Sequence, residues 1–599
     1  MNENKKKWSL GRKLVLAVVI LAVLVVAGVG GLLLGGKYFT GQETKVRDTW
    51  AVDTGELLNY DSELNMDVHE AKLEASVKVI QLVPGEIEED GFTYYDVAVQ
   101  QRLQEMLAKT IAMGQWTPEA PLVALNPYGT GSNGLYVYFE TQRACSVSYT
   151  IHVEDEAIPD YTAVVPNDGE NGNSKVQEFQ IVGLVPGETN EVTLALTGAW
   201  GNEYKKVTFE VTMPETASGY PTVLEYTDGE SAQPLSDGLY ALTRVNGTLG
   251  YVFFFDNAGV LRYEMVLEGY GADRFLEYEG DILTSVSSNK LACINGLGQV
   301  TRVYELGQYD MHHDFCFGQE GTLLVLAEEE GRLDVDVEDL VLEVDLVSGQ
   351  VDLLIDFTQL MNDYYVNFTR KIRADDPFFW QVGERDWIHI NSIAWMEADD
   401  SVVLSSREQS TILKVKAIHE APEVTYLLGD ARFWEGTGYE NLCYAQAGEA
   451  FMPQYGQHNV EVSYDDELPE GCYYLTFYNN NYWTISSRQD EYQPAELDPG
   501  VGVGLYDDGD DLSYVYTYLV DENAKTYALA DSYAVPYSSI VSNADEQANG
   551  NEVVNSGVAN VFGEYDAEGN LIREFKYTCT LQNYRVFKET FAGIWSAAE

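Results

Sequence analysis

Apolar and polar residues alternate over short segments through most of the chain, and helical spacing of apolar residues is confined to one stretch. Residues 122–213 contain five alternating segments separated by turns, among them GLYVYFET and CSVSYTIHV. Alternation directs every second side chain to one face and predicts β-strands with one buried face. The segment from Tyr95 to Gly114 instead places its apolar residues at helical spacing, which predicts one helix there.

These patterns divide the chain into four regions. We expect a basic tail and membrane helix at 1–40, a connecting region with the one helix at 41–121, a small N-terminal β-sandwich at 122–217 and a β-propeller at 235–599. In the last region a strand, a turn with Asp or Asn and Gly, and a second strand recur, as in FFFDNAGVLRYEM (253–265) and FGEYDAEGNLIREF (562–575). Recurrent hairpins of this kind are typical of propeller blades, and their spacing favours an all-β fold with six blades. An extended array of sandwiches is the alternative.

The N-terminal region has the pattern of a membrane anchor. The run from Leu14 to Leu34 carries no charge and follows a basic segment that includes Lys5 and Lys13. At about 1.5 Å per residue it covers about 30 Å, the thickness of a bilayer's hydrocarbon core, and the basic flank favours the cytoplasmic side. We therefore expect a single-pass protein of the cell membrane whose larger part is extracytoplasmic. A cleaved signal peptide is the alternative.

Charge and cysteine content exclude several classes of protein. The 599 residues include 96 acidic and 36 basic side chains, for a net charge of -60. Nucleic-acid binding needs clustered Lys and Arg and is not expected. The six cysteines form no CxxC pair, which argues against a structural zinc site. We expect buried or unpaired thiols, with some disulfides as the alternative.

Four of the seven histidines lie in segments that resemble one another. His312 and His313 lie in MHHDF, His389 in DWIHINSI and His458 in GQHNVEV, and each segment opens a strand. Equivalent positions of successive blades border the central channel of a propeller, so these histidines are expected to converge. Neighbouring side chains of a strand point to opposite faces, so only one of His312 and His313 should face the channel. Alignment with GQHNVEV favours His313.

Two further residues belong to the predicted site. Asn391 lies two residues after His389 and shares its face, and Arg407 follows by one hairpin at the end of VVLSSR. Imidazoles with a guanidinium in so acidic a protein favour a site for a small oxyanion such as sulfate or phosphate. A metal site is the alternative; no carboxylate recurs with the histidines, and the arginine would repel a cation, so neither a metal nor a cofactor is expected. The chain also lacks a Gly-rich phosphate loop between a strand and a helix, which argues against a nucleotide donor.

The quoted motifs carry a resemblance to a known family. The run DWIHINSIAWMEADDSVVLSSREQSTILKV (386–415), the segment GQHNVEV and the upstream MHHDF resemble the bacterial aryl-sulfate sulfotransferases. The resemblance covers the predicted propeller and, more loosely, the sandwich before it. It implies a six-bladed propeller enzyme that moves a sulfuryl group from a phenolic sulfate ester to a phenol, by a ping-pong mechanism through a sulfohistidine and without a nucleotide.

The resemblance also implies roles for the residues. The family's sulfated histidine falls on His458, and its supporting residues fall on His313, His389 and Arg407. Asn391 and His312 are expected to help bind the sulfate. Periplasmic members carry a disulfide shortly before the nucleophile, but only Cys443 lies in that interval here, so this bridge is not expected.

The expected partners are aryl sulfates and phenols, together with the membrane through the N-terminal helix; a homodimer is left open. Two other functions remain as alternatives: a cell-surface propeller that only binds a ligand, and an aryl sulfatase in which water accepts the sulfuryl group.

Overall fold

In the computed structural model, the described residues are 42–45, 56–61, 66–71, 78–84 and 93–597, apart from 168, 170–171, 249, 330, 333–336, 377–380, 490–499 and 507–508. The predicted membrane helix within residues 1–40 lies outside this part. Among the helices of the described ranges, none has both the length and the apolar character needed to cross a membrane.

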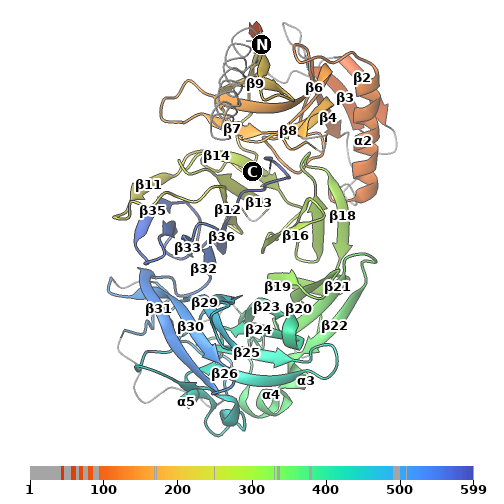
Figure 1. Ribbon diagram of the computed structural model, residues 1–599. Coiled ribbons are helices and arrows are strands. Elements are labelled where there is room, and N and C mark those ends of the chain that lie inside the picture. The colour runs from red at the N-terminus through yellow and green to blue at the C-terminus, as the bar shows by residue number, and fades with distance from the viewer. Residues whose placement is uncertain are drawn as a thin grey trace, which may run out of the picture.

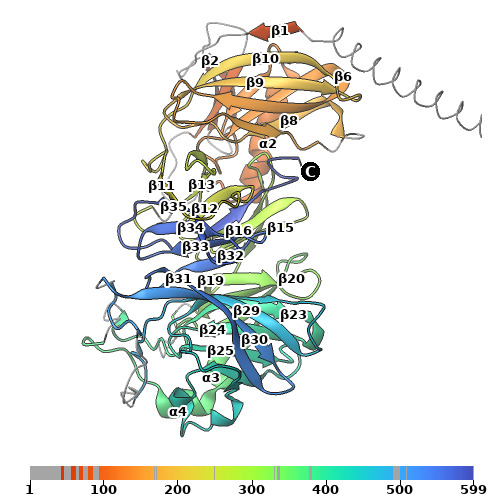
Figure 2. The ribbon, with the colours of Figure 1, turned by 60° about the vertical axis from the view of Figure 1, so that its left-hand side comes forward.

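The N-terminal part of the chain forms one ten-stranded sheet (Figure 2). The long strand β6 connects it, because its first half pairs with β5 and β8 and its second half with β7 and β9. The strands expected to form two sheets of a sandwich are thus hydrogen-bonded into one network. Its strands are β1 (Gln42–Lys45), β2 (Glu56–Asp61), β3 (Met66–Ala71), β4 (Lys78–Pro84), β5 (Leu122–Leu125), β6 (Leu135–His152), β7 (Tyr161–Val164), β8 (Ser174–Ile181), β9 (Thr189–Gly198) and β10 (Glu203–Thr212).

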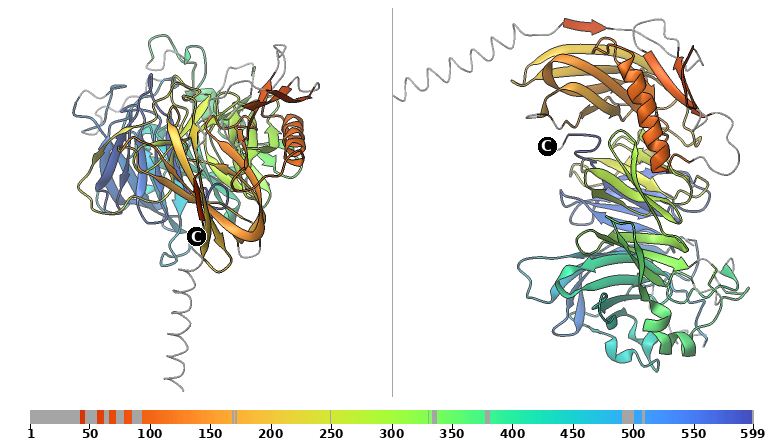
Figure 3. Two further views of the ribbon diagram at one scale, coloured as in Figure 1. Left: turned by 90° about the horizontal axis from the view of Figure 1, so that it is seen from above. Right: turned by 90° about the vertical axis from the view of Figure 1, so that its right-hand side faces the viewer.

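The predicted helix is α2 (Val97–Ala112), which runs beside this sheet (Figure 3). The Asp96 side chain caps it by accepting hydrogen bonds from the backbone N–H groups of residues 98 and 99. Leu103, Met106 and Leu107 form its buried face and pack against Leu122 and other apolar residues of β5 and β6. The helical spacing in the sequence therefore reflects one apolar face turned toward the sheet.

The remaining strands form six sheets of four or five strands around a common centre (Figure 1). Neighbouring strands run antiparallel, except that residues 445–446 pair in parallel with residues 526–527. In the order of the ring they are β36 (Arg585–Glu589), β12 (Leu239–Thr243), β13 (Tyr251–Phe255) and β14 (Leu261–Val266); β15 (Phe275–Tyr278), β16 (Asp281–Ser287), β17 (Lys290–Ile294) and β18 (Val300–Glu305); β19 (Tyr309–Phe317), β20 (Thr322–Glu329), β21 (Leu340–Asp345) and β22 (Val351–Asp356); β23 (Ile390–Met396), β24 (Ser401–Ser406), β25 (Thr411–Lys416) and β26 (Glu423–Gly429); β28 (His458–Ser463), β29 (Cys472–Asn479), β30 (Leu512–Asp521), β31 (Thr526–Pro536) and β27 (Ala445–Gln446); and β32 (Asn543–Glu546), β33 (Glu552–Ser556), β34 (Val561–Tyr565), β35 (Leu571–Lys576) and β11 (Glu225–Asp228). The arrangement is mostly β and propeller-like.

Two sheets are completed by strands from distant parts of the sequence. Strand β36 pairs with β12, and β11 pairs with β35. Lys588 on β36 is fully buried and donates hydrogen bonds to Glu564, Tyr240 and Asn257. A buried ammonium is stable only with such partners, so this contact fixes where the two ends of the ring meet.

The segment between β22 and β23 supports one side of the channel. It contains α3 (Phe357–Leu360) and α4 (Asn362–Phe368), and the short helices η3 (Glu397–Asp399), α5 (Ala431–Trp434) and η4 (Glu440–Leu442) follow β23 and β26. Tyr364 of α4 packs against Trp387 and Trp434, whose side chains are fully buried. This aromatic cluster holds the chain just before His389 in place.

Candidate active site

The predicted site residues come from three neighbouring sheets. His312 and His313 lie on β19, His389 immediately precedes β23, and His458 is the first residue of β28. Strand β23 lies between β19 and β28 at the centre of the ring. Segments about 70 residues apart in sequence are thus brought side by side by the ring.

A cavity of about 690 Å³ opens at this point. His313, His389, Arg407 and His458 all line it, and all four residues are buried. Asn391 does not line the cavity; its buried amide donates to the carbonyl of Gln457 at 2.8 Å and so holds the residue before His458. The structure therefore gives Asn391 a supporting contact and not the direct one expected.

His312 and His313 do not follow the alternation expected of a strand. His313 has φ +62°, and the pairing of β19 with β20 shifts register between Met311 and Phe315. The two rings lie 5.0 Å apart, and both reach the carboxylate of Glu338. The left-handed residue turns the chain at this point, so the strand is irregular here. Only His313 lines the cavity, whereas His312 is buried behind it.

His458 is held in one tautomer by its neighbours. Its Nδ1 lies 2.7 Å from Oδ1 of Asn480 and 3.0 Å from the carbonyl oxygen of Gly456. The Asn480 amide nitrogen donates to the carbonyls of Ser538 and Val541, which fixes its oxygen toward the ring. Both partners of Nδ1 are acceptors, so Nδ1 carries the proton and Nε2 keeps its lone pair. Burial lowers the pKa of His458 well below its usual value, so the ring is neutral.

His389 is the cationic histidine of the site. Its Nδ1 lies 2.8 Å from Oδ2 of Asp386 and also contacts the carboxylate of Glu338. Burial and the positive charge of Arg407 lower the pKa of His389, but Asp386 and Glu338 outweigh them and raise it to about 9. The Arg407 guanidinium donates to the same Asp386 oxygen at 2.8 Å. His389 and Arg407 thus present two positive groups held by shared carboxylates.

The sequence reasoning missed both of these carboxylates. Asp386 stands at the start of the run that contains His389, three residues before it, and could have been found by looking for a partner of the histidine. Glu338 lies in an acidic stretch before β21 and carries no local signal. Its left-handed backbone, with φ +55°, directs it into the site, and this depends on the tertiary structure.

Two overlapping groups of side chains have the spacing of a cation site. Ligand atoms of His312, His313 and Glu338, and likewise those of Glu338, Asp386 and His389, lie within 4.8 Å of one another. The Arg407 guanidinium at the Asp386 oxygen opposes a further positive charge. The contacts are therefore better described as ion pairs among protein groups.

Part of the lining of the cavity is apolar. It contains Leu505, Ile540, Val541, Val558 and Leu581. Beside it, the Arg244 guanidinium lies between the rings of Tyr270 and Tyr584, at 3.9 and 4.3 Å from their centroids. The cavity thus joins a polar, positively charged floor to a wall that suits an aromatic ring.

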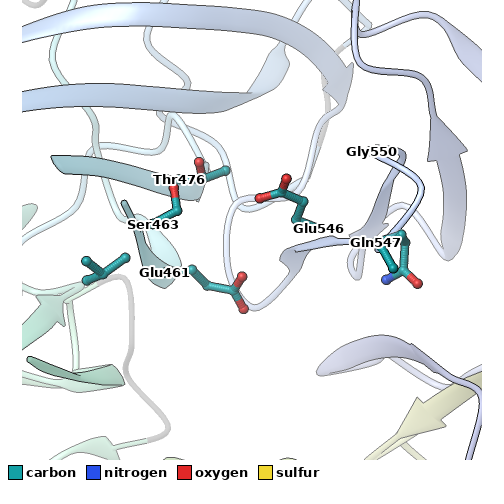
Figure 4. A pocket seen from close by; sticks show the side chains of 8 residues that line it. Glu461, Ser463, Thr476, Glu546, Gln547 and Gly550 are labelled. Carbon is teal, nitrogen blue, oxygen red and sulfur yellow. The ribbon is translucent and has the colours of Figure 1, made fainter. Parts of the chain in front are cut away.

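A second pocket lies at the other end of β28 (Figure 4). It has a volume of about 450 Å³ and is lined by Glu461, Ser463 and Thr476 from β28 and β29, and by Glu546 and the turn that follows it. None of the predicted site residues lines it. Its carboxylates disfavour an anionic substrate.

All six cysteines lie in the described ranges, and none forms a disulfide. This agrees with the preferred expectation of unpaired thiols and with the missing bridge near Cys443.

Comparison with known protein families gives a match for the N-terminal sheet and a match for the ring of six sheets. The profile described as "Arylsulfotransferase (ASST)" matches residues 225–587, and the "Arylsulfotransferase Ig-like domain" matches residues 122–214. The arylsulfate sulfotransferase AssT of Escherichia coli O6:H1 is 22% identical over 327 residues, which cover 47% of this chain and 51% of that protein. AssT of Lelliottia amnigena is 27% identical over 169 residues, 23% of this chain and 27% of that protein. The chain thus spans at most about half the length of these curated relatives.

Among solved structures, the WD40 domain of Toxoplasma gondii coronin is similar at 9% identity and a TM-score of 0.28, over 60% of this chain and 78% of that domain. A streptogramin B lyase is similar at 11% identity and a TM-score of 0.22, over 59% of this chain and 96% of the lyase.

Proposed function

Because the chain belongs to the arylsulfotransferase family, we propose that it is an aryl-sulfate sulfotransferase. In this proposal, the six sheets are the blades of a six-bladed propeller, and the cavity receives a phenolic sulfate ester and then a phenol. The sulfuryl group passes through His458 without a nucleotide donor. The protein is anchored by its N-terminal segment with the propeller outside the cell; a homodimer remains open.

One observation carries the mechanism: the Nδ1 of His458 has only acceptors as partners. A neutral imidazole held in this tautomer presents the lone pair of Nε2, which is the form needed for nucleophilic attack. The histidine is also one of the residues that line the cavity. The geometry thus supports His458 as the nucleophile.

In the first half-reaction, Nε2 of His458 attacks sulfur and the S–O bond to the phenol breaks. His313 enters this step as an imidazolium. The departing phenolate keeps the electron pair of the S–O bond, takes one proton from His313 and leaves as the phenol, and His313 becomes neutral. In the second half-reaction, an incoming phenol returns its proton to His313 and its oxygen attacks sulfur, which restores His458. Atoms and charges balance over the cycle, and kinetics are ping-pong.

Positive groups stabilise the sulfuryl oxygens during both steps. Transfer of SO3 resembles phosphoryl transfer, with charge on the peripheral oxygens, so the site acts mainly by position and electrostatics. Arg407 and the cationic His389 fill this role, and Asp386 holds both in place. The apolar wall with Leu505 and Val541 accommodates the aryl ring.

Mass spectrometry tests the proposal directly. The protein is mixed with p-nitrophenyl sulfate, quenched and digested under conditions that preserve phosphoramidate-like bonds. We expect one added SO3 on the peptide that contains His458, lost when phenol is added and absent in His458→Ala. Free sulfate released equally with and without phenol would favour an aryl sulfatase. Binding without turnover or label would favour a protein that only binds its ligand.

A further inference from the structure

We propose that Glu338 is a positioning residue that contacts two imidazoles of the site, fixing the tautomer of His313 and the orientation of the cationic His389. This inference rests on the proposed function. It deepens that function by assigning the proton transfer to a pair of side chains, a carboxylate and His313, where the sequence showed only the histidine.

The first contact is with His313. Nε2 of His313 lies 3.2 Å from Oε1 of Glu338, and both side chains are at least 85% buried. A carboxylate beside Nε2 holds the proton on that nitrogen and leaves the lone pair on Nδ1. The ring also stacks on Tyr584, with centroids 5.2 Å apart, which restricts its rotation. When His313 takes a proton, the imidazolium forms next to a fixed negative charge, as in a Ser-His-Asp triad.

The second contact is with His389. The other oxygen of Glu338, Oε2, contacts Nδ1 of His389, and the two histidine rings lie 4.9 Å apart. His389 has Asp386 as a second carboxylate partner, whereas Glu338 is the carboxylate that contacts His313. Loss of Glu338 should therefore affect proton transfer at His313 more than the charge of His389.

The backbone indicates that this placement is specific. Glu338, His313 and His389 all have positive φ, at 55°, 62° and 47°. Non-glycine residues adopt this conformation only at a cost in backbone strain, and it clusters where side chains must be aimed at a site. Three such residues in mutual contact support a built arrangement.

The experiment separates proton transfer from general damage by varying the leaving group. Glu338→Gln keeps the size of the side chain but removes its charge. Glu338→Asp keeps the charge but shortens the side chain, which moves the carboxylate away from the two histidines. The matched control is Glu343→Gln, which removes the carboxylate from a Glu–His pair near the surface, where Glu343 lies 3.0 Å from His419. Each variant is assayed with phenyl sulfate and with p-nitrophenyl sulfate, whose phenolate leaves without help from an acid.

For Glu338→Gln we expect kcat/KM to fall about 100-fold with phenyl sulfate, within the usual range for general acid catalysis, and less than about 5-fold with p-nitrophenyl sulfate. Glu338→Asp should recover part of the loss, and Glu343→Gln should match wild type. An equal loss with both donors, accompanied by a lower melting temperature, would mean that Glu338 is only structural. Unchanged rates with both donors would also overturn the inference.

Three further outcomes separate failure of the proposed function from failure of the role of Glu338. If wild type carries no SO3 on His458, the proposed function fails and the role of Glu338 fails with it. If wild type is labelled but Glu338→Gln shows no dependence on the donor, only the role of Glu338 fails. Loss of activity on dialysis against EDTA, restored by a divalent cation, would show that the carboxylate binds a metal and would also overturn the inference.

Discussion

The two ends of the short strand β28 line two pockets of different charge. His458 opens the strand in the cavity with Arg407 and His389, while Glu461, three residues later, lines the acidic pocket. Burial acts on both: it lowers the pKa of His458 and raises the pKa of Glu461. Each group is driven toward its neutral form, because desolvation penalises charge of either sign.

The difference between the ends lies in their surroundings. At the first end the neutral imidazole keeps a free lone pair beside two positive groups, which supports the nucleophilic role proposed for it. At the other end burial and Asp314 favour protonation of Glu461, against the nearby Arg274 and a hydrogen bond from Asn459. Burial alone therefore does not distinguish the two ends; the charges beside each group do.

The sharpest test removes the group at the reactive end. His458→Ala should lower sulfuryl transfer by at least about 10³-fold, because loss of a nucleophile removes the covalent route. The measurement is the burst of p-nitrophenol from p-nitrophenyl sulfate under single-turnover conditions. A variant that retains the burst would show that another group attacks.

Removing a positive partner should have the next largest effect. Arg407→Gln should lower kcat by about 10²-fold, a typical cost for losing one stabilising group of a developing anion. The partner charge on Asp386 is then left with His389 alone, so the melting temperature should fall as well. Arg244→Gln, which alters the aromatic side of the cavity, is the comparison and should change KM more than kcat.

The charge of His389 should set an alkaline limit for the reaction. The pKa of His389 is raised to about 9 by Asp386 and Glu338, which overcome burial and Arg407. The cation is therefore present below that pH and is lost as pH rises through about 9. Its contribution to stability is complete below its ordinary pKa of about 6.5 and disappears over the same rise.

We expect the single-turnover rate of the wild type to fall about tenfold per pH unit above 9. This alkaline decrease should be absent from the pH–rate profile of His389→Gln. A rate that stays level to pH 10.5 in wild type would contradict this. Titration of His458 does not change the rate in this pH range, because its lowered pKa keeps the ring neutral.

The smallest effect is expected at the acidic end of β28. Glu461→Gln should leave the rate within about twofold of wild type, since the pocket lies outside the reaction. A neutral side chain avoids the cost of burying a carboxylate, so the melting temperature at pH 8 should be equal or slightly higher. A large loss of activity would show that the two ends of the strand are coupled.

The sequence was most informative where a pattern is local. Alternating segments and Asp–Gly turns predicted the strands, and apolar spacing predicted α2. The recurrence of histidines at strand starts led to His313, His389 and His458, which the structure brings to one cavity. These patterns could be read from the sequence because each depends on a few neighbouring residues.

Features that depend on distant contacts could not be predicted in this way. Glu338 enters the site through a left-handed backbone in a connection between strands, and Asn480 fixes the tautomer of His458 from the end of β29. The positive φ of His313 and the register shift between Met311 and Phe315 likewise have no counterpart in the alternating pattern of the sequence. The positions of these side chains depend on tertiary contacts, so the periodicity of the sequence does not predict them.

The meeting of β36 with β12 has a consequence for biosynthesis. Residues 585–589 supply the innermost strand of the sheet that begins with β12, at residue 239. A ribosome must therefore translate nearly 350 further residues before that sheet can be finished. Until then its inner edge offers unpaired backbone groups, so a nascent or truncated chain is exposed to misassociation and should depend on chaperones.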